Sequence, residues 1–272
     1  MTLAEILASL FPDGHAVRVA DGLIGGDGPF AEGQATVIGV DGDTPLGVEG
    51  ALALARAVLD AVHVGDGALS ADVDAGSAHE SARKQGLGAG DDRGAVGNGA
   101  KAPILVLVDS DSQRMSRRDE LLGLNECLAH LAKALLLADQ AGHPTVGLIY
   151  GHSAAGAFIA TALATRVLAA LPGADPSVMD LPSVARVTKL PLDKLQEMAK
   201  STPVFAPGLD NMVATGAVHA VLDPEKPLAG QIRALIAEAA AEDVRDRLGA
   251  ARGGRPVAQA VAEAVAAAAL RG

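Results

Sequence analysis

Two buried-strand patterns, separated by one long helical pattern, constrain the fold of this chain more than any other feature. "PILVLVDS" (103–110) and "PTVGLIY" (144–150) are apolar runs typical of strands covered on both faces. Between them, residues 116–142 predict a single long helix with Ser116 at its N-cap and Gly142 at its end. Strands joined by a right-handed crossover helix are parallel, so the sequence predicts an α/β fold with a largely parallel sheet.

Weaker patterns predict the other elements. Apolar periodicity and turn residues favour strands within 16–40 and over 217–223. Helices are expected over 2–10, 48–62, 155–170, 182–189, 192–200, 209–216, 227–248 and 256–270. Residues 65–100 hold nine glycines in 36 residues and almost no large apolar side chain. That stretch predicts a flexible insertion within a single domain of residues 1–272.

Charge and composition exclude several classes of function. The chain has 22 Lys and Arg against 33 Asp and Glu, a net charge of −11, and 2% aromatic residues, which argues against nucleic-acid binding. Cys127 is the only cysteine, so neither an internal disulfide nor a cysteine metal cluster is possible. The seven histidines show no metal-ligand spacing, so no metal site is expected. With no signal peptide and no membrane-spanning run in the sequence, we expect a cytoplasmic protein.

The loop "DSDSQRMSRRDE" (109–120) follows the carboxyl end of a predicted strand, where open α/β sheets bind ligands. Arg114, Arg117 and Arg118 lie at or just before the first helical turn, where positive charge opposes the helix dipole. Two interpretations stay open. The arginines hold an anionic group, or they pair with acidic residues of the same turn, Asp119 and Glu120.

The stretch "IYGHSAAGAF" (149–158) resembles the strand–turn–helix elbow that presents a nucleophilic serine. As a hydrolase, the chain would use Ser153 as nucleophile and His219 as base. The residue orienting the base would be Asp175, Asp180 or Asp210. Against this, Ala155 replaces the fifth-position glycine of the elbow, and His219 falls within a predicted strand.

The same turn has a second interpretation, in which the backbone carries the chemistry. Small residues over 153–157 let the start of a helix approach a ligand closely, so the N–H groups of Ala155 and Gly156 would face a developing oxyanion. Small residues here are equally compatible with tight packing alone. Elsewhere, Arg186 and Lys189 share one helix face, either as a solvated surface or as an anion contact.

Longer strings carry a family resemblance. "SRRDELLGLNE" and "ARVTK", within a similarity that covers about 102–223 and is looser over 14–62, resemble the gamma subunit of malonate decarboxylase. That resemblance implies a crotonase-like spiral of repeated β-β-α units, of the type found in the C-terminal half of carboxyltransferases.

The resemblance also implies a function and partners. Together with a beta subunit, such a chain is expected to decarboxylate a malonyl thioester on an acyl carrier protein, giving acetyl thioester and CO₂. The carrier bears a CoA-like phosphopantetheine group, an alpha subunit exchanges acetyl for malonyl, and no cofactor is bound directly. Biotin is not expected. The rival interpretations are a biotin-dependent relative, a non-catalytic scaffold subunit and the stand-alone serine hydrolase.

Site residues follow from the resemblance too. Loss of CO₂ leaves an enolate, which backbone amides after two strands stabilise in this superfamily. The matching places here are the loop Ser112–Gln113–Arg114 and the turn Ala155–Gly156.

The expected contacts with substrate come from Ser112, Arg114, His152 and Arg186. A proton must also return to the α-carbon, and Ser153, His152 and Gln113 remain alternatives for supplying it.

Overall fold

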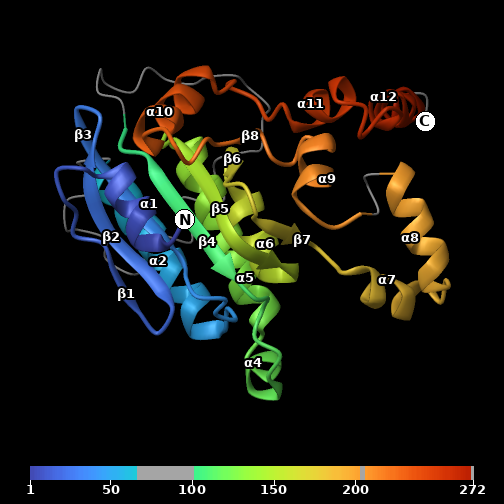
Figure 1. The fold of residues 1–272 in the computed structure, drawn as a ribbon, viewed down its shortest axis with the longest axis horizontal. Helices are drawn as coiled ribbons and strands as arrows, with labels where there is room; N and C mark the ends of the chain where they lie inside the picture. Colours follow the sequence, from blue (N-terminus) through green and yellow to red (C-terminus); the bar gives the residue numbers. More distant parts are fainter. Residues whose placement is uncertain (66–100, 203–205, 271–272) are drawn as a thin grey trace.

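The computed structural model describes residues 1–65, 101–202 and 206–270, so nearly all of the predicted glycine-rich insertion lies outside the described residues. The described strands form one sheet of eight, in the order β1-β2-β3-β4-β5-β6-β8 with β7 added beside β5 (Figure 1). Their bounds are β1 Arg18–Ala20, β2 Leu23–Phe30, β3 Gly33–Val40, β4 Ile104–Ser110, β5 Thr145–Ala154, β6 Val167–Ala170, β7 Asp175–Ser177 and β8 Ala220–Val221.

The helices lie on both faces of the sheet and at its ends (Figure 1). They are α1 Leu3–Leu10, α2 Val48–Gly65, α4 Arg117–Leu121, α5 Leu124–Gln140, α6 Ala155–Ala160, α7 Leu181–Thr188, α8 Leu192–Ser201, α9 Leu209–Ala214, α10 Leu228–Glu238, α11 Arg245–Ala251 and α12 Ala258–Ala269, with a short 3₁₀ turn η1 at Ala162–Ala164. No helix among the described residues is both long and apolar enough to span a bilayer.

The sheet is parallel from β3 onward, and only the β1–β2 and β2–β3 pairs are antiparallel. The predicted α/β class with a largely parallel sheet is therefore confirmed. Alternate residues of the central strands enter two separate cores. Ile104, Val106 and Val108 of β4 pack in the core that contains α2 and α5, whereas Leu105 and Leu107 pack in the core that contains α1 and α10.

The predicted helix over 155–170 is wrong in its second half. Helix α6 ends at Ala160, the η1 turn follows, and Val167–Ala170 form strand β6 beside β5. All four residues of β6 are buried. Alanine has high helix propensity, but here pairing along the edge of β5 and burial on both faces outweigh that local preference.

The predicted single helix over 116–142 is two helices, α4 and α5. Gly123, at φ +78°, adopts the left-handed conformation between them, so α4 turns away from α5 and projects from the body (Figure 1). The predicted cap is confirmed, since the Ser116 hydroxyl accepts the Asp119 N–H at 3.2 Å. The predicted end is confirmed as well, because α5 stops at Gln140 and Gly142 has φ +90°.

Two further predictions near the C-terminus needed correction. The helix expected over 227–248 is broken into α10 and α11, because residues 239–244 lie between them outside any helix. Of the strand expected over 217–223, only the two residues of β8 form a strand, and they pair with Ala169 and Ala170 of β6.

Candidate active site

The loop after β4 is held by a backbone bridge to the chain segment that precedes α2. The Leu46 N–H donates to the Ser112 carbonyl at 2.8 Å, and the Arg114 N–H donates to the Leu46 carbonyl at 2.9 Å. The Ser112 hydroxyl donates to the Gln113 carbonyl at 3.0 Å. These bonds fix the backbone on either side of Gln113, and they already employ the Arg114 amide. The side chain of Gln113 is left as the adjustable part of the loop.

The turn after β5 begins later than the sequence suggested. Strand β5 continues from the predicted Tyr150 to Ala154, because β7 pairs with its last three residues, His152 to Ala154. The chain then turns sharply at Ala155, whose φ of +51° lies in the left-handed region. A non-glycine residue is strained there by about 1 kcal/mol. A glycine, the residue that the serine elbow has at this position, would adopt the same conformation without strain.

The structure brings two of the predicted site residues into direct contact. The Gly156 N–H donates to Gln113 Oε1 at 2.8 Å, joining the turn after β5 to the loop after β4. A Cβ added to Gly156 would lie 3.0 Å from the same oxygen, so the glycine permits this close approach. The backbone amide at the start of α6 thus holds a carbonyl-type oxygen at hydrogen-bond distance.

A half-buried contact fixes the backbone just before the turn. Asp109 Oδ1 of β4 accepts the His152 N–H at 2.9 Å. The Asp109 carboxylate occupies the space of the missing Gly151 side chain, where a Cβ would lie 2.2 Å from Oδ1. Gly151 is therefore required for Asp109 to reach the backbone of β5, and together they set the position of His152.

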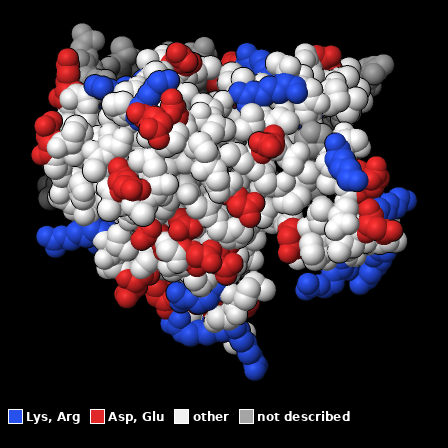
Figure 2. All heavy atoms as spheres, viewed as in Figure 1, with Lys and Arg blue, Asp and Glu red and all other residues white. Residues whose placement is uncertain are grey.

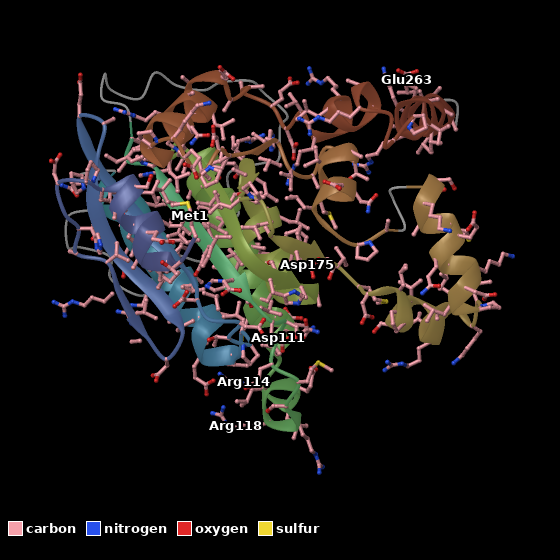
Figure 3. All side chains as sticks on the ribbon, in the orientation of Figure 1. Met1, Asp111, Arg114, Arg118, Asp175 and Glu263 are labelled. Carbon is pink, nitrogen blue, oxygen red and sulfur yellow. The ribbon has the colours of Figure 1, made fainter. Side chains whose placement is uncertain are left out.

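The His152 imidazole lies among carboxylates from three different segments. Its Nδ1 atom is 3.6 Å from Asp175 Oδ2 of β7, and its side chain is 36% exposed. Asp43, Asp111 and His152 place one donor atom each within 4.8 Å of one another. Figure 3 shows Asp111 and Asp175 at the same end of the sheet. Because Asp43 and Asp111 are exposed, we interpret this group as solvated counter-charges around the imidazole.

The predicted serine nucleophile is inaccessible. Ser153 is fully buried, and its hydroxyl has no hydrogen-bond partner among the described residues. The proposed base is elsewhere, since His219 bonds to the backbone of Leu168, which pairs with Gly147 of β5. Ser153 lies six residues further along β5, about 20 Å away at the usual rise per residue. This geometry argues against the stand-alone serine hydrolase.

His219 is a structural residue. Its backbone N–H donates to the Leu168 carbonyl at 2.7 Å, and its Nδ1 accepts the Leu168 N–H at 3.1 Å. Burial first, and the nearby Arg245 guanidinium second, lower the pKa of His219 below its ordinary value of 6.5.

A pH dependence of stability follows from this shift. Below about pH 6.5 the unfolded chain binds a proton at His219 that the folded chain resists, so the free energy of unfolding falls as the pH decreases. We expect His219→Gln, whose amide oxygen can still accept the Leu168 N–H, to flatten this fall by up to about 1.4 kcal/mol per pH unit. Urea unfolding of the wild type and the variant between about pH 7.5 and about pH 5.5 measures the slope of the free energy of unfolding against pH. The same slope in the variant as in the wild type would show that His219 does not cause the pH dependence of stability.

The arginines near α4 pair within the chain. Arg118 Nη1 lies 2.6 Å from Glu49 Oε1 at the start of α2 and 3.6 Å from Asp119 Oδ1. Arg114 lies 3.7 Å from Glu49 and 3.8 Å from Asp119, whose side chain is 1% exposed. For these two arginines the structure favours pairing with acidic residues, and Glu49 is a partner that local sequence did not indicate. Arg117 is exposed.

Arg186 lies apart from the other predicted residues. It is exposed near the end of α7, which packs against α8 and contributes no buried residue. Figure 1 shows α7 and α8 projecting together from the body, away from α4 and from the loop at the end of β4. The structure therefore does not bring Arg186 to the turn at Gly156.

Two functional features were missed at the level of sequence. Asp109 supports His152 from the neighbouring strand, and Asp43 approaches it from the segment after β3. The only signal for the first was a carboxylate at the end of a buried strand.

Figure 2 shows acidic side chains gathered above the arginines of α4, so this end of the molecule is negatively charged apart from its tip.

A family model and a curated relative both match proteins that act on malonyl groups. The family model for "Malonate decarboxylase gamma subunit" matches residues 92–269. A curated protein of Malonomonas rubra, "Malonyl-S-ACP:biotin-protein carboxyltransferase MADD", is 34% identical over 171 residues, covering 58% of this chain. The match spans 59% of that relative's own length.

Solved structures match over nearly the whole chain. A chain of a Pseudomonas malonate decarboxylase hetero-tetramer in complex with coenzyme A is 26% identical with a TM-score of 0.66, covering 98% of this chain and 97% of its own. A chain of the Pseudomonas MdcD–MdcE hetero-dimer is 25% identical with a TM-score of 0.64, covering 95% and 97%. Transcarboxylase 12S, at 14% identity and a TM-score of 0.62, covers 88% of this chain and 41% of its own, and shares the fold. The predicted crotonase-like carboxyltransferase fold is confirmed.

Proposed function

Because the chain belongs to the malonate decarboxylase gamma subunit family, we propose that it works with a beta subunit to decarboxylate a malonyl thioester carried on an acyl carrier protein. The products are acetyl thioester and CO₂. The observation that carries this proposal is the match, at 26% identity and 97–98% mutual coverage, to a chain of a malonate decarboxylase assembly. It is tested by assaying CO₂ release from malonyl thioester by the complex with a beta subunit.

The chemistry requires a donor for the enolate oxygen that forms when CO₂ leaves. The Gly156 N–H is such a donor, and it holds Gln113 Oε1 at 2.8 Å, within the 2.7–3.1 Å expected for an oxyanion contact. We propose that a substrate oxygen takes the place of this amide oxygen. The Ala155 amide, at the strained residue just before, is the second proposed donor.

The loop after β4 supplies the remaining proposed contacts. Gln113 would release Gly156 by a side-chain rotation, since within the described residues its Nε2 makes only a weak 3.9 Å contact, to Met115 Sδ. Ser112 would contact substrate through its half-buried side chain. We assign Arg114 to holding this loop through Glu49 and Asp119, from where its guanidinium would also contact a malonyl carboxylate.

Exposed apolar side chains beside the site support the need for a partner. Met115 is 81% exposed and Leu121 is 77% exposed, both on the projecting segment that contains α4. Apolar groups exposed together on a projection are typical of a protein interface. A beta subunit seated here would cover the loop that carries Gln113. The alpha subunit and the acyl carrier protein complete the proposed assembly.

Carboxyl transfer to a biotin protein is the second candidate, because the 34% identical relative bears that description. We favour direct release of CO₂, since two solved structures that match nearly the whole chain are those of malonate decarboxylases. The phosphopantetheine group would then belong to the carrier, with no cofactor held by this chain.

We further propose that residues 1–272 form one domain, because a single sheet joins the first and last described strands. A cytoplasmic location, where carrier-bound thioesters are made and used, belongs to the same proposal.

A further inference from the structure

Decarboxylation leaves a carbanion that must receive a proton at the former malonyl α-carbon. The sequence left Ser153, His152 and Gln113 as alternatives for supplying it. We propose, on the basis of the proposed function, that His152 is the proton donor, and the structure distinguishes the three residues by burial and by the bonds they make.

Ser153 and Gln113 are poorly suited to the task. The Ser153 hydroxyl is fully buried with no bonded partner among the described residues, so no chain of contacts reloads it from water. Gln113 has an amide side chain, which neither gains nor loses a proton near neutral pH, and its oxygen is bound to the Gly156 N–H.

Tyr150, the residue two positions before His152, is excluded as well. Its hydroxyl donates to Asp41 Oδ1 at 2.7 Å. Burial first, and the bond to Asp41 second, raise the pKa of Tyr150 well above its ordinary value. The phenol therefore holds its proton tightly and is a poor acid.

The position of His152 suits a proton donor. It lies three residues before Ala155 and four before Gly156, on the strand that leads into the proposed amide donors. Asp109 and the missing Cβ of Gly151 fix its backbone. Because its side chain is 36% exposed, water can reach the imidazole and return a proton to it.

The charged groups around the imidazole are carboxylates from separate segments. Asp175 Oδ2 of β7 lies 3.6 Å from Nδ1. Asp43 follows β3 and Asp111 follows β4. One carboxylate oxygen of each and one ring nitrogen of His152 all lie within 4.8 Å of one another. Carboxylates this close to the ring attract its N–H groups and so orient the imidazole.

The step consumes one proton per turnover, and solvent supplies it. After CO₂ leaves, the electron pair of the enolate forms a C–H bond with the imidazolium proton, and the thioester carbonyl is restored. The N–H bond of His152 breaks, and its electron pair remains on the nitrogen. A proton from water then reloads the neutral imidazole.

His152→Gln in the complex with a beta subunit tests this role. General acid catalysis contributes about 10²–10⁴-fold, so we expect kcat for acetyl thioester formation to fall by about 10²–10³-fold while KM changes by less than about 3-fold. The matched control is His130→Gln, the same substitution at an exposed position on α5, which should leave both constants unchanged. Circular dichroism and co-purification with the partner establish that each variant is folded.

A second measurement separates a catalytic from a structural role. Run backwards, the donor is a base that removes a proton from the acetyl methyl group, so the wild-type complex should exchange these hydrogens with D₂O. His152→Gln should lose this exchange by about 10²-fold, and in His152→Ala, which leaves space for the ring, added imidazole should restore part of it. An active wild type with near-normal turnover and exchange in His152→Gln overturns the proposal. A wild-type complex that releases no CO₂ overturns the proposed function, and the proposal with it.

Discussion

Replacing Gly156 by proline is expected to lower kcat for decarboxylation by about 10²–10³-fold, the usual loss when one oxyanion donor is removed. Proline has no backbone N–H, so the bond that Gly156 now makes at 2.8 Å to Gln113 Oε1, and the proposed bond to the substrate oxygen, are both lost. Position 156 is the second residue of α6, in the first helical turn, where proline does not break the helix. Steady-state rates of CO₂ release by the purified complex measure the effect.

Gly156→Ala is the matched control, because alanine keeps the N–H. Its Cβ would lie 3.0 Å from Gln113 Oε1, a contact that a small movement of the Gln113 side chain relieves. We expect less than about a tenfold loss of kcat, or about 1.4 kcal/mol. Full decarboxylation by Gly156→Pro would show that this amide is not a donor, and would favour a scaffold role for the chain.

Gly39→Ala is expected to destabilise the folded chain by about 3 kcal/mol or more. Gly39 is a buried residue of β3, paired with Leu107 of the neighbouring strand β4. A Cβ at this position would lie 1.9 Å from the Leu107 carbonyl oxygen. Because that atom belongs to the backbone of a central strand, the two strands would have to separate. Urea unfolding followed by circular dichroism measures the change.

Gly33→Ala is the control for this substitution. Gly33 is exposed at the start of the same strand, and a Cβ there would meet no atom within 4 Å. We expect a change within about 0.5 kcal/mol. Similar free energies of unfolding for the two variants would contradict the register of β3 against β4.

The central strands were predictable because their apolar runs are long and bounded by clear turn signals. Strand β6 was not, since "TRVLAA" continues an alanine-rich pattern and only its pairing with β5 makes it a strand. The break between α4 and α5 depends on one glycine at positive φ, Gly123, in a sequence that otherwise suits a helix throughout. In each case a tertiary contact or a single backbone conformation outweighed local propensity.

The two loops of the site could be located from the sequence, because both follow buried parallel strands. The contacts between them could not. The bond from Gly156 to Gln113 joins residues 43 positions apart, and the Asp109 contact to the His152 N–H also spans 43 positions. The pairing of Arg118 with Glu49 crosses from α4 to α2. Such contacts depend on the register of strands and on loop geometry, which no local pattern encodes.

Release of CO₂ from a malonyl thioester is the direct test of the proposed function. The chain is co-expressed with its beta subunit, and the complex is supplied with malonyl thioester on an acyl carrier protein, with no biotin protein present. We expect the complex to form acetyl thioester and CO₂ in equal amounts, while the chain alone forms neither.

Absence of CO₂ from the complete complex would contradict this account, and turnover restored only by a biotin protein would favour carboxyl transfer instead. Reaction of the isolated chain with a fluorophosphonate at Ser153 would contradict it as well, because that residue is fully buried in the structure.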